Sequence, residues 1–448
     1  MNTKILLIGL WGCLYQLSFG QGYSLKQCIE YADRNSGKIL NAQYDVAIAQ
    51  KKVNEQIGSM LPQVSATGTY NDNLKLGTTA MPAELLGGKA GETVAISMGT
   101  QHNLSAEAKL EQKIFDPTFG VALKAAKISK QQSELTLQQT REELFYNVTV
   151  TYYRTLVIQK EAELLNATLD ASVQSLASTE LKYSNGMAKK IDVDKIKVSC
   201  NNTRSSLQQK ELGYRQSLNK LKYYMGMPVD SAIALTDTTV AFALAPEKIG
   251  IGVYNIENHV DYKLQLSTLD LYEANKRKET AGYLPTLSFN ANYGYDAMRN
   301  EFNFFKPGQD WYNSYGVGLT LSVPIFDGLQ RKNRIAQTKL NIKVSEENVK
   351  LAAQSLKVDL SNYEIEYNNA INNIRNEKES LDLAQGVYDN SRLAYQQGTG
   401  SSLELVQAES SLRESQSNYF NKLLDLYIAR IGLEKSKGNL SEYINNIK

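Results

Sequence analysis

Twice along this chain, a helix-like stretch ends at a Leu-Pro pair and a strictly alternating stretch begins. The first switch is Leu61-Pro62 in GSMLPQVSATGTY, and the second is Leu284-Pro285 in AGYLPTLSFNANY. Apolar and small polar residues then alternate, which is the period of a β-strand with two different faces. Proline suits the switch because it cannot continue a helix. The apolar positions are Val64, Ala66, Gly68 and Tyr70, and then Leu287, Phe289, Ala291 and Tyr293.

Further matching motifs follow both switches in the same order. KIFD at 113–116 corresponds to PIFD at 324–327, and KYSNG at 182–186 corresponds to AYQQG at 394–398. Between and after these motifs lie long, proline-poor runs rich in Ala, Leu, Gln, Lys and Glu, which favour helices. The ordered set predicts an internal two-fold sequence repeat.

Each repeat is predicted to hold a first helix, two strands separated by a loop, and two long helices joined at a glycine turn. The first helices are expected at about 24–58 and 255–282, and the loop of the first repeat is a Gly-rich stretch at 71–103. Repeat 1 is expected at residues 21–235, with strands at about 62–72 and 104–115 and a hairpin tip at about 184–191. Repeat 2 is expected at residues 236–448, with strands at about 285–295 and 315–326 and a hairpin tip at about 396–403.

The N-terminus has the pattern of a secretory signal peptide. Lys4 precedes a short apolar run at 5–17, and Ser18 and Gly20 are the small residues expected before a cleavage site. We therefore expect residues 1–20 to be removed on export. Lipid attachment at Cys13 is the less favoured alternative. No later segment reaches the length of apolar sequence that a transmembrane helix needs.

Composition argues against several classes of function. Lys and Arg total 49 against 47 Asp and Glu, a net charge of +2, so no strongly basic surface suggests nucleic acid as a partner. His102 and His259 are the two histidines, which leaves little material for histidine-based metal sites or catalytic triads. No glycine-rich phosphate-binding motif is present. The sequence therefore predicts a protein that is not an enzyme and that binds no cofactor or metal.

The alternating strands allow two interpretations. A soluble sheet would need a partner layer for its apolar faces, and the neighbouring rods offer no obvious layer. A membrane strand explains the pattern better, with apolar side chains toward lipid, polar side chains toward a lumen and aromatic residues at the ends. Spanning strands must close into a barrel. Since four strands cannot close, several chains must share one barrel; two chains would give eight strands and three would give twelve.

Taken together, the doubled pattern resembles the TolC-like outer-membrane efflux proteins over essentially the whole mature chain. The hairpins YSNGMAKKIDV and YQQGTGSSLEL are similar to the tips of that family. The resemblance implies an α+β membrane protein in which a long α-helical coiled-coil barrel continues a transmembrane β-barrel, with four strands per chain and twelve in a homotrimer. It also implies the outer-membrane exit duct of a tripartite efflux or secretion system, with its helices in the periplasm. Its implied partners are outer-membrane lipid, a periplasmic adaptor and an inner-membrane transporter.

The resemblance also implies positions for a periplasmic gate. Tyr395 matches the family's gating tyrosine, Asp192 matches its carboxylate partner, and Glu404 matches one acid of a constricting ring. Gly400 and Gln407 depart from the pattern, since an arginine and a second acid are expected there. A simpler alternative is that Asp192 and Glu404 are acids at helix N-termini, where the helix dipole favours them.

Other functional positions follow from the same resemblance. The tips at Gly186, Met187, Gly398 and Thr399 are expected to dock the adaptor, and Pro62 and Pro285 mark the helix-to-strand junctions. An exported coiled-coil stalk or adhesin remains the alternative function, since it would explain export and long helices, although not four symmetric alternating strands.

Overall fold

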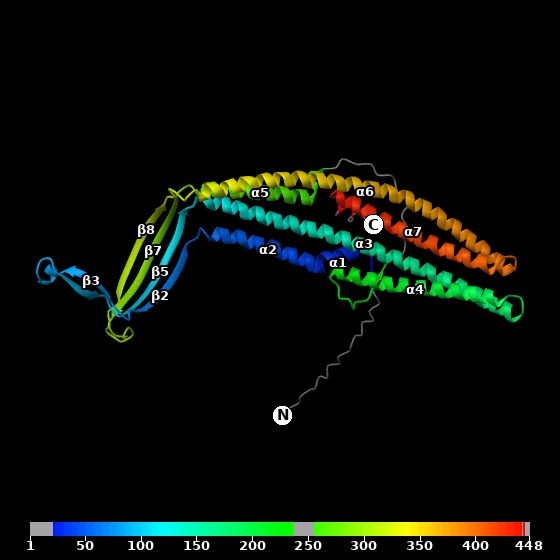
Figure 1. Ribbon diagram of the computed structural model, residues 1–448, viewed down its shortest axis with the longest axis horizontal. Coiled ribbons are helices and arrows are strands. Elements are labelled where there is room, and N and C mark those ends of the chain that lie inside the picture. Colours follow the sequence, from blue (N-terminus) through cyan, green and yellow to red (C-terminus); the bar gives the residue numbers. More distant parts are fainter. Residues whose placement is uncertain (1–20, 237–254, 441, 444–448) are drawn as a thin grey trace, which may run out of the picture. The chain divides into compact units, whose positions relative to one another are not determined.

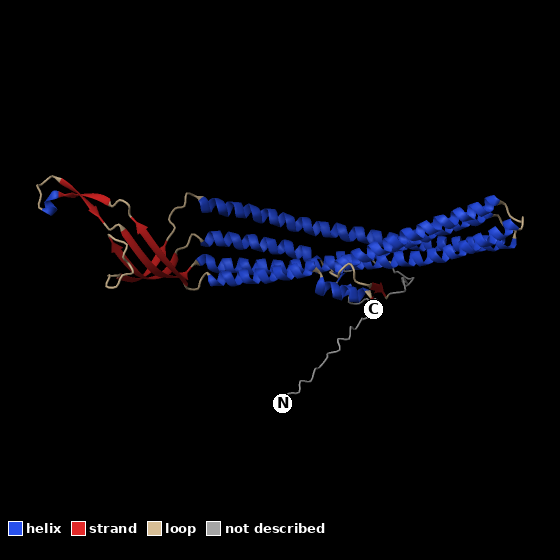
Figure 2. Ribbon diagram, turned by 90° about the horizontal axis from the view of Figure 1, so that it is seen from below, coloured by secondary structure: helices blue, strands red, loops and turns tan. Residues whose placement is uncertain are grey.

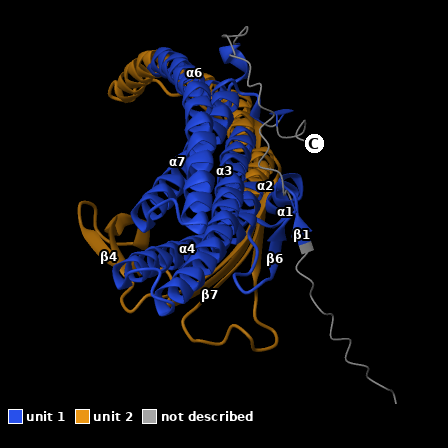
Figure 3. Cartoon of the chain, turned by 90° about the vertical axis from the view of Figure 1, so that its right-hand side faces the viewer, with its two compact units in different colours: residues 1–45, 134–265, 348–448 blue, residues 46–133, 266–347 orange. Residues whose placement is uncertain are grey.

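The computed structural model describes residues 21–236, 255–440, 442 and 443 of the chain (Figure 1). The expected signal peptide at 1–20 lies outside these residues, as does most of the segment that joins the two predicted repeats. The chain divides into two compact units (Figure 3). Unit 1 comprises residues 1–45, 134–265 and 348–448, and unit 2 comprises residues 46–133 and 266–347.

Unit 2 contains a four-stranded antiparallel sheet, whose strands lie side by side in Figure 1. Its order is β2-β5-β7-β8, so β2 and β8 are the two edges and the β5–β7 pair joins the two halves of the chain. The strands are β2 (Gln63–Asp72), β5 (His102–Phe115), β7 (Thr286–Arg299) and β8 (Tyr312–Ser322). Pro62 and Pro285 each stand one residue before a strand.

The register of the sheet gathers the apolar side chains on one face. Apolar or glycine residues oppose each other in successive pairs: Val64–Leu110, Ala66–Ala108, Gly68–Ala106 and Tyr70–Leu104; Leu110–Ala291, Ala108–Tyr293 and Ala106–Tyr295; Phe289–Leu319, Ala291–Val317 and Tyr293–Tyr315. This face is uncovered, with Tyr315 81% and Val317 79% exposed. The alternation seen in single strands is therefore a property of the whole sheet.

The other face of the sheet is polar and partly charged. Glu107, Lys109 and Glu111 of β5 point to this side, because strand side chains alternate. Their neighbours are small or polar on both sides: Thr67, Ser65 and Gln63 of β2, and Gly294, Asn292 and Asn290 of β7. A one-residue slip of register would exchange the two faces.

Several strand predictions differ from the structure: β7 runs to Arg299 rather than to about 295, and β8 begins at Tyr312 rather than at about 315. The strand expected to reach Phe326 ends at Ser322, because Pro324 has no N–H to donate to a ladder. The loop expected at 71–103 contains a second, two-stranded hairpin, made of β3 (Gly77–Pro82) and β4 (Thr93–Met98) and closed by the 3₁₀-helix η1 (Ala83–Leu86).

The helices make most of the chain (Figure 2). Two are 68 residues long, α3 and α6, and each turns into a shorter helix, α4 or α7. In each predicted repeat, a helix of 22 residues (α2 or α5) precedes the strands of the sheet, and a 68-residue helix and a shorter helix follow them. The bounds are α1 (Leu25–Asn35), α2 (Gly37–Gly58), α3 (Pro117–Ser184), α4 (Lys190–Met225), η2 (Ile256–Asn258), α5 (Val260–Ala281), α6 (Gln330–Gln397) and α7 (Ser402–Ser436).

The first helix, expected to be continuous over 24–58, is broken at Ser36. Ser36 is extended and 4% exposed, while its N–H still donates to the carbonyl of Ala32. The backbone of Gly226, at the end of α4, approaches the break so closely that a Cβ there would overlap Asn35. The break thus allows the C-terminal end of α1 to pack against the C-terminal end of α4. Nearby, β1 (Gln21–Tyr23) pairs in parallel with β6 (Ile233–Leu235), an element that the sequence did not predict.

Unit 1 is held by three clusters of buried side chains. One surrounds Tyr152 and Leu221, a second surrounds Tyr367 and Ile371, and the third surrounds Tyr395 near the helical turns. Within the described residues, no helix is both long and apolar enough to cross a membrane.

We expect opposite effects from two glycine substitutions in the long helices. A Cβ at Gly432 of α7 would overlap the ring of Tyr363 on α6, whereas a Cβ at Gly386 of α6 meets no atom within 4 Å. Gly432→Ala should lower the free energy of unfolding by about 1–3 kcal/mol through overpacking. Gly386→Ala should raise it by about 0.5–1 kcal/mol through helix propensity. Urea titration followed by circular dichroism measures both; a stabilised Gly432→Ala variant would contradict the close packing of α6 and α7.

Candidate functional site

Both long helical hairpins reverse direction at a left-handed glycine. Gly186 has a φ of 76° and Gly398 a φ of 80°, conformations that other residues rarely adopt. Around Gly186, the N–H of Met187 donates to the carbonyl of Lys182 over 2.8 Å, which is a helix-ending pattern. Added Cβ atoms would meet nothing within 4 Å at either glycine, so backbone conformation alone selects glycine. These turns explain the Tyr-x-x-Gly motifs.

The helices that leave the turns begin with an acidic residue in their first turn. The N–H of Ser401 donates to Glu404 Oε2 over 3.0 Å, and the N–H of Glu404 donates to Ser401 Oγ over 3.2 Å, a reciprocal capping box. At α4, the N–H of Lys189 donates to Asp192 Oδ2 over 3.3 Å. Asp192 and Glu404 therefore occupy equivalent helix-capping positions, as the simpler sequence interpretation expected.

Asp192 makes a second contact that leaves its own hairpin. The hydroxyl of Ser402, the first residue of α7, donates to Asp192 Oδ1 over 2.5 Å. This hydrogen bond is the main cause that lowers the pKa of Asp192 below its ordinary value, against a smaller effect of burial and with help from the N–H of Lys189. The carboxylate thus links the first turns of α4 and α7.

Tyr395 forms the second link between the hairpins. Its side chain is 9% exposed, and its hydroxyl lies 2.8 Å from the hydroxyl of Thr179 on α3. The ammonium of Lys182, also on α3, lies 5.0 Å from the centre of the Tyr395 ring and donates to the Tyr395 carbonyl over 3.1 Å and the Gln396 carbonyl over 3.4 Å. Lys182 therefore caps the end of α6 while it holds Tyr395.

Further from the turns, a buried carboxylate continues the seam between α4 and α7. Glu409 is 3% exposed and accepts from the hydroxyl of Thr203 over 3.0 Å. Arg413 donates to the same hydroxyl over 3.0 Å. The seam is filled by an apolar cluster whose members are Ile196, Cys200, Tyr388, Tyr395, Leu405, Ala408 and Leu412.

The structure thus gathers the expected gate residues at one end of the helical hairpins, but with other partners. Among the residues that the structure describes, Tyr395 and Asp192 share no hydrogen bond; each bonds across to the other hairpin through Thr179 or Ser402. Glu404 is exposed and stays within its own capping box.

Three partner residues were not predicted from the sequence: Thr179, Lys182 and Ser402. One signal was available for Lys182, because KYSNG carries a lysine where AYQQG carries Ala394. Where two repeats differ at a matched position, the residue that differs can be one that bonds to the other repeat, as Lys182 does to the end of α6.

The tips carry exposed apolar side chains around the turns. Met187 is 75% exposed and Leu181 65%, and Ile191 and Leu403 in the first turns of α4 and α7 are 57% and 56% exposed. Gly186, Gly398 and Thr399 are exposed as well. Contiguous exposed apolar side chains at a defined structural end are typical of a docking surface.

The helix-to-strand junctions are closed by local contacts. The side-chain amide of Gln63 donates to the carbonyls of Gly58 and Leu61, both over 3.1 Å, which satisfies the end of α2. At the second junction, Arg334 pairs with Glu279 at 2.9 Å. In the described part of the chain, no group of three or more His, Cys, Asp or Glu side chains is placed to hold a metal ion.

Comparison with known proteins places these features in context. A family model described as "Outer membrane efflux protein" matches residues 28–227 and 260–439. The outer membrane protein TolC of Vibrio cholerae is 20% identical over 421 residues, which cover 94% of this chain and 91% of that protein. The solved structure of VceC from Vibrio cholerae aligns with a TM-score of 0.70 at 15% identity, over 92% of this chain and 96% of that one. The CmeC channel of Campylobacter jejuni aligns with a TM-score of 0.73 at 14% identity, over 94% and 88%.

The lowered pKa of Asp192 predicts how the contact with Ser402 depends on pH. A lowered carboxyl pKa stabilises the folded state above the ordinary pKa of 3.8, and this contribution is lost as the pH falls through the lowered value. The thermal midpoint of Ser402→Ala should therefore lie below wild type by a constant amount from about pH 5 to 7, and the difference should shrink below about pH 4. Ser411→Ala, an exposed serine on the same helix, is the control. A difference that persists unchanged at pH 3 would contradict the role of the ionised carboxylate.

Proposed function

Because this chain belongs to the outer membrane efflux protein family, we propose that it is the outer-membrane exit duct of a tripartite efflux system. The family is one of outer-membrane channels whose helical part lies in the periplasm, and its members are not enzymes. In the proposed assembly, a periplasmic adaptor and an inner-membrane transporter pass substrates into the duct. The family match, over both halves of the chain, argues against the stalk or adhesin considered from the sequence.

One observation carries the proposal: the sheet has an apolar face, a polar face and two open edges. Every residue of β2 is exposed, and β8 is exposed at all but one position. Open edges are not tolerated in lipid, so the edges must pair with other copies of the chain. Adjacent strands in the sheet alternate in direction, so β8 of one copy meets β2 of the next in antiparallel orientation. Closure then turns the apolar face to lipid and the polar face to the lumen.

The helices support association of the same kind. On α6, Leu351, Val358 and Ile365 follow one another at heptad spacing and are 62%, 51% and 63% exposed. On α4, Ile191 and Val198 are one heptad apart and are 57% and 58% exposed. Apolar heptad positions bury themselves against a partner helix in a coiled coil. These stripes lack that partner within the described chain and would gain it from a neighbouring copy.

We infer three copies. A homotrimer closes twelve strands into a barrel wide enough for a lumen, whereas eight strands enclose an interior that side chains fill. The two segments that the family model matches support the internal repeat. A trimer of doubled chains would place six similar helical hairpins around the axis.

The hairpin ends would form the periplasmic gate and the adaptor surface. Two contacts between hairpins, Thr179 with Tyr395 and Ser402 with Asp192, would hold the duct narrow at rest. Three copies of the exposed Glu404 would favour cations at the constriction. The exposed apolar side chains at Met187 and beside the glycine turns would seat the adaptor.

The decisive measurement is conductance in a planar bilayer, with the mass of the detergent-purified protein determined first. We expect a trimeric mass and discrete channels that prefer cations. Glu404→Ala should move the reversal potential in a salt gradient toward zero, because three carboxylates leave the constriction. Glu414→Ala, an exposed acid further along α7, should leave it unchanged. A monomeric protein without channels would refute the duct, and an unchanged reversal potential in Glu404→Ala would remove Glu404 from the constriction.

The two faces of β8 should respond differently to charge. Val317 is on the apolar face near the middle of the strand, and the next residue, Gly318, is on the polar face with open space around it. Val317→Arg should lower the stability of the protein in lipid vesicles by about 2–4 kcal/mol, while Gly318→Arg should have a much smaller effect. Urea titration of tryptophan fluorescence in vesicles measures both. Equal losses in the two variants would contradict a lipid-facing apolar side.

A further inference from the structure

Within the described residues, the two-stranded β3–β4 hairpin has an apolar face that is only partly covered, since Met81 and Ile96 are half-buried and the rest of the face is exposed. The register places Met81, Val94, Ile96 and Met98 on one side, and Thr78, Ala80, Ala95 and Ser97 on the other. Met98 is 61% and Val94 41% exposed, and at the closed end Leu85 and Leu86 are 70% and 59% exposed. Two-stranded hairpins are marginally stable alone in water. This hairpin therefore presents an apolar surface that a partner would stabilise.

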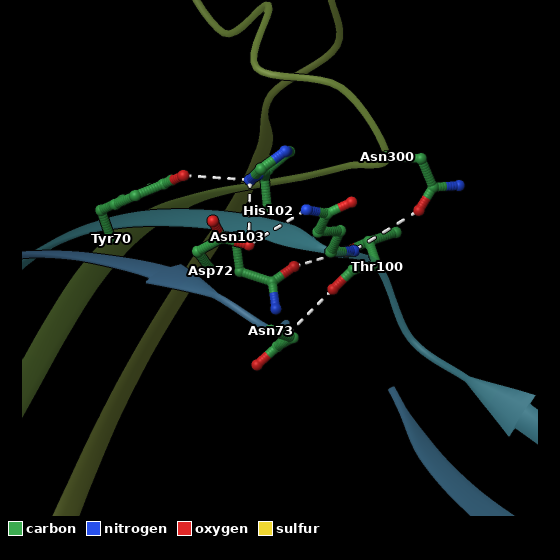
Figure 4. A network of polar contacts seen from close by, with 8 residues as sticks. Tyr70, Asp72, Asn73, Thr100, His102, Asn103 and Asn300 are labelled. Carbon is green, nitrogen blue, oxygen red and sulfur yellow. Dashed lines mark hydrogen bonds and ion pairs between the residues drawn. The ribbon is translucent and has the colours of Figure 1, made fainter. Parts of the chain in front are cut away.

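Hydrogen bonds hold the base of the hairpin to the end of the four-stranded sheet, as Figure 4 shows. The N–H of Asn73 donates to the carbonyl of Gln101 over 2.7 Å, and its side-chain amide donates to the carbonyl of Thr100 over 2.9 Å. Gln101 in turn donates to Asp72 over 3.3 Å and to Asn300 over 3.4 Å. These bonds extend the β2–β5 ladder and tie it to the loop between β7 and β8.

Aromatic packing reinforces the same corner of the sheet. The hydroxyl of Tyr70 lies 3.0 Å from His102 Nδ1, and Asp72 Oδ1 lies 3.5 Å from the same nitrogen, as Figure 4 shows. Phe302, from the β7–β8 loop, sets its ring edge-on against both Tyr70 and His102, at 5.6 and 6.2 Å between ring centres. The hairpin thus follows directly after a packed corner at the end of β2.

The position of this corner identifies the partner. Asp72 ends β2 opposite His102, His102 is opposite Arg299, and Tyr312 begins β8 opposite Asp296, so the end of β2 and the start of β8 lie at the same end of the sheet. If β2 of one copy pairs with β8 of the next, the hairpin that follows β2 lies beside the residues that precede Tyr312 in that next copy. This step rests on the proposed function.

The segment that would face the hairpin has matching chemistry. The β7–β8 loop carries Phe305, 80% exposed, Phe302, 61% exposed, and Trp311, 36% exposed. Exposed aromatic rings are well suited to cover an aliphatic strand face. The first residue of β8, Tyr312, is 60% exposed and extends the same surface.

From these observations we infer that the β3–β4 hairpin is a clasp between copies of this chain, in which its apolar face packs on the aromatic β7–β8 loop of the next copy. Each copy both gives a hairpin and receives one. The clasp ties the copies together beyond the end of the barrel ladder, where strand pairing has stopped.

Cysteine cross-linking tests the clasp in the intact protein. Phe305→Cys is combined with Met98→Cys or with Leu85→Cys, and the native Cys28 and Cys200 are buried and do not compete. Under oxidation, the double variants should give bands of two and three chains on denaturing gels. Phe305→Cys with Ala95→Cys, on the opposite face, should give few such bands. Monomer bands alone from both double variants, or equal cross-linking of the Ala95→Cys pair, would overturn the clasp.

A second measurement does not depend on the distance between two cysteines. Val94→Ser with Ile96→Ser should lower the temperature at which the oligomer dissociates in detergent by several degrees, while Ala80→Ser with Ala95→Ser should leave it unchanged. If the wild-type protein is an oligomer that conducts, but the cysteine variants do not cross-link and the Val94→Ser, Ile96→Ser variant dissociates at the wild-type temperature, the clasp is refuted. The duct proposal is then unaffected. A wild-type protein that is monomeric would refute the proposed function, and the clasp with it.

Discussion

The unpaired backbone groups at the edges of the sheet are the constraint on which the rest of the structure depends. In a bilayer each unpaired N–H or C=O group costs several kcal/mol, because no water is there to replace the missing partner. One chain supplies a sheet whose apolar face suits lipid and whose two edges, β2 and β8, do not. No change of side chain can repair this, since the open groups belong to the backbone. Only another strand can, and the alternating strand directions make a second copy a suitable donor.

The helices also lack a partner, since they expose apolar side chains at heptad positions. Their exposed heptad positions lose little by meeting water one at a time, but together they form stripes that a coiled-coil partner would cover. Buried clusters already fill the contacts within the chain, around Tyr152, Tyr367 and Tyr395. The apolar heptad positions that stay exposed are therefore not needed for packing within the chain, and they would be available to pack against another copy. Under the proposed function, the open strand edges require copies of the chain to associate, and the helical stripes would add apolar area to the same interface.

The parts of the fold that the sequence predicted are those that a local period determines. The alternation after Pro62 and Pro285 and the long proline-free helical runs are readable because each depends on side chains close in sequence. The β3–β4 hairpin was missed because β3 is mostly Gly, Thr and Ala and shows little contrast between its faces, so the alternation in β4 has no clear partner in the sequence. The break at Ser36 was missed because it depends on a distant residue, Gly226, packing against it. The expected strand bounds erred at Pro324, which ends the ladder of β8, and on both sides of the β7–β8 loop, where β7 runs on to Arg299 and β8 begins at Tyr312.

In the candidate site, too, the features that depend on neighbouring residues were predictable and those that depend on distant residues were not. The capping positions of Asp192 and Glu404 follow from sequence alone, as does the need for glycine at the turns. Their partners across the hairpins do not, since Thr179 and Tyr395 are far apart in the chain and nothing local distinguishes Thr179 from other threonines of α3. The family resemblance suggested a bond between Tyr395 and Asp192, whereas in the described chain each residue has its own partner. Hydrogen bonds between residues this far apart in the chain can be identified only from the three-dimensional structure.

The division between local and long-range contacts also determines what opening of the proposed gate would cost. The capping bonds of Asp192 Oδ2 and Glu404 lie within single hairpins, so they survive if each hairpin moves as a rigid body. Contacts between hairpins must break; near the tips these are Thr179 with Tyr395, Ser402 with Asp192, and Lys182 with the carbonyls of Tyr395 and Gln396. Each such hydrogen bond contributes about 0.5–1.5 kcal/mol net. Over three copies the sum is about 6 kcal/mol or more, at or above the roughly 5.5 kcal/mol that turns a population that is 99:1 closed into one that is 99:1 open. An adaptor that gains this much by binding the open tips would suffice to open the duct, without any change inside the helices.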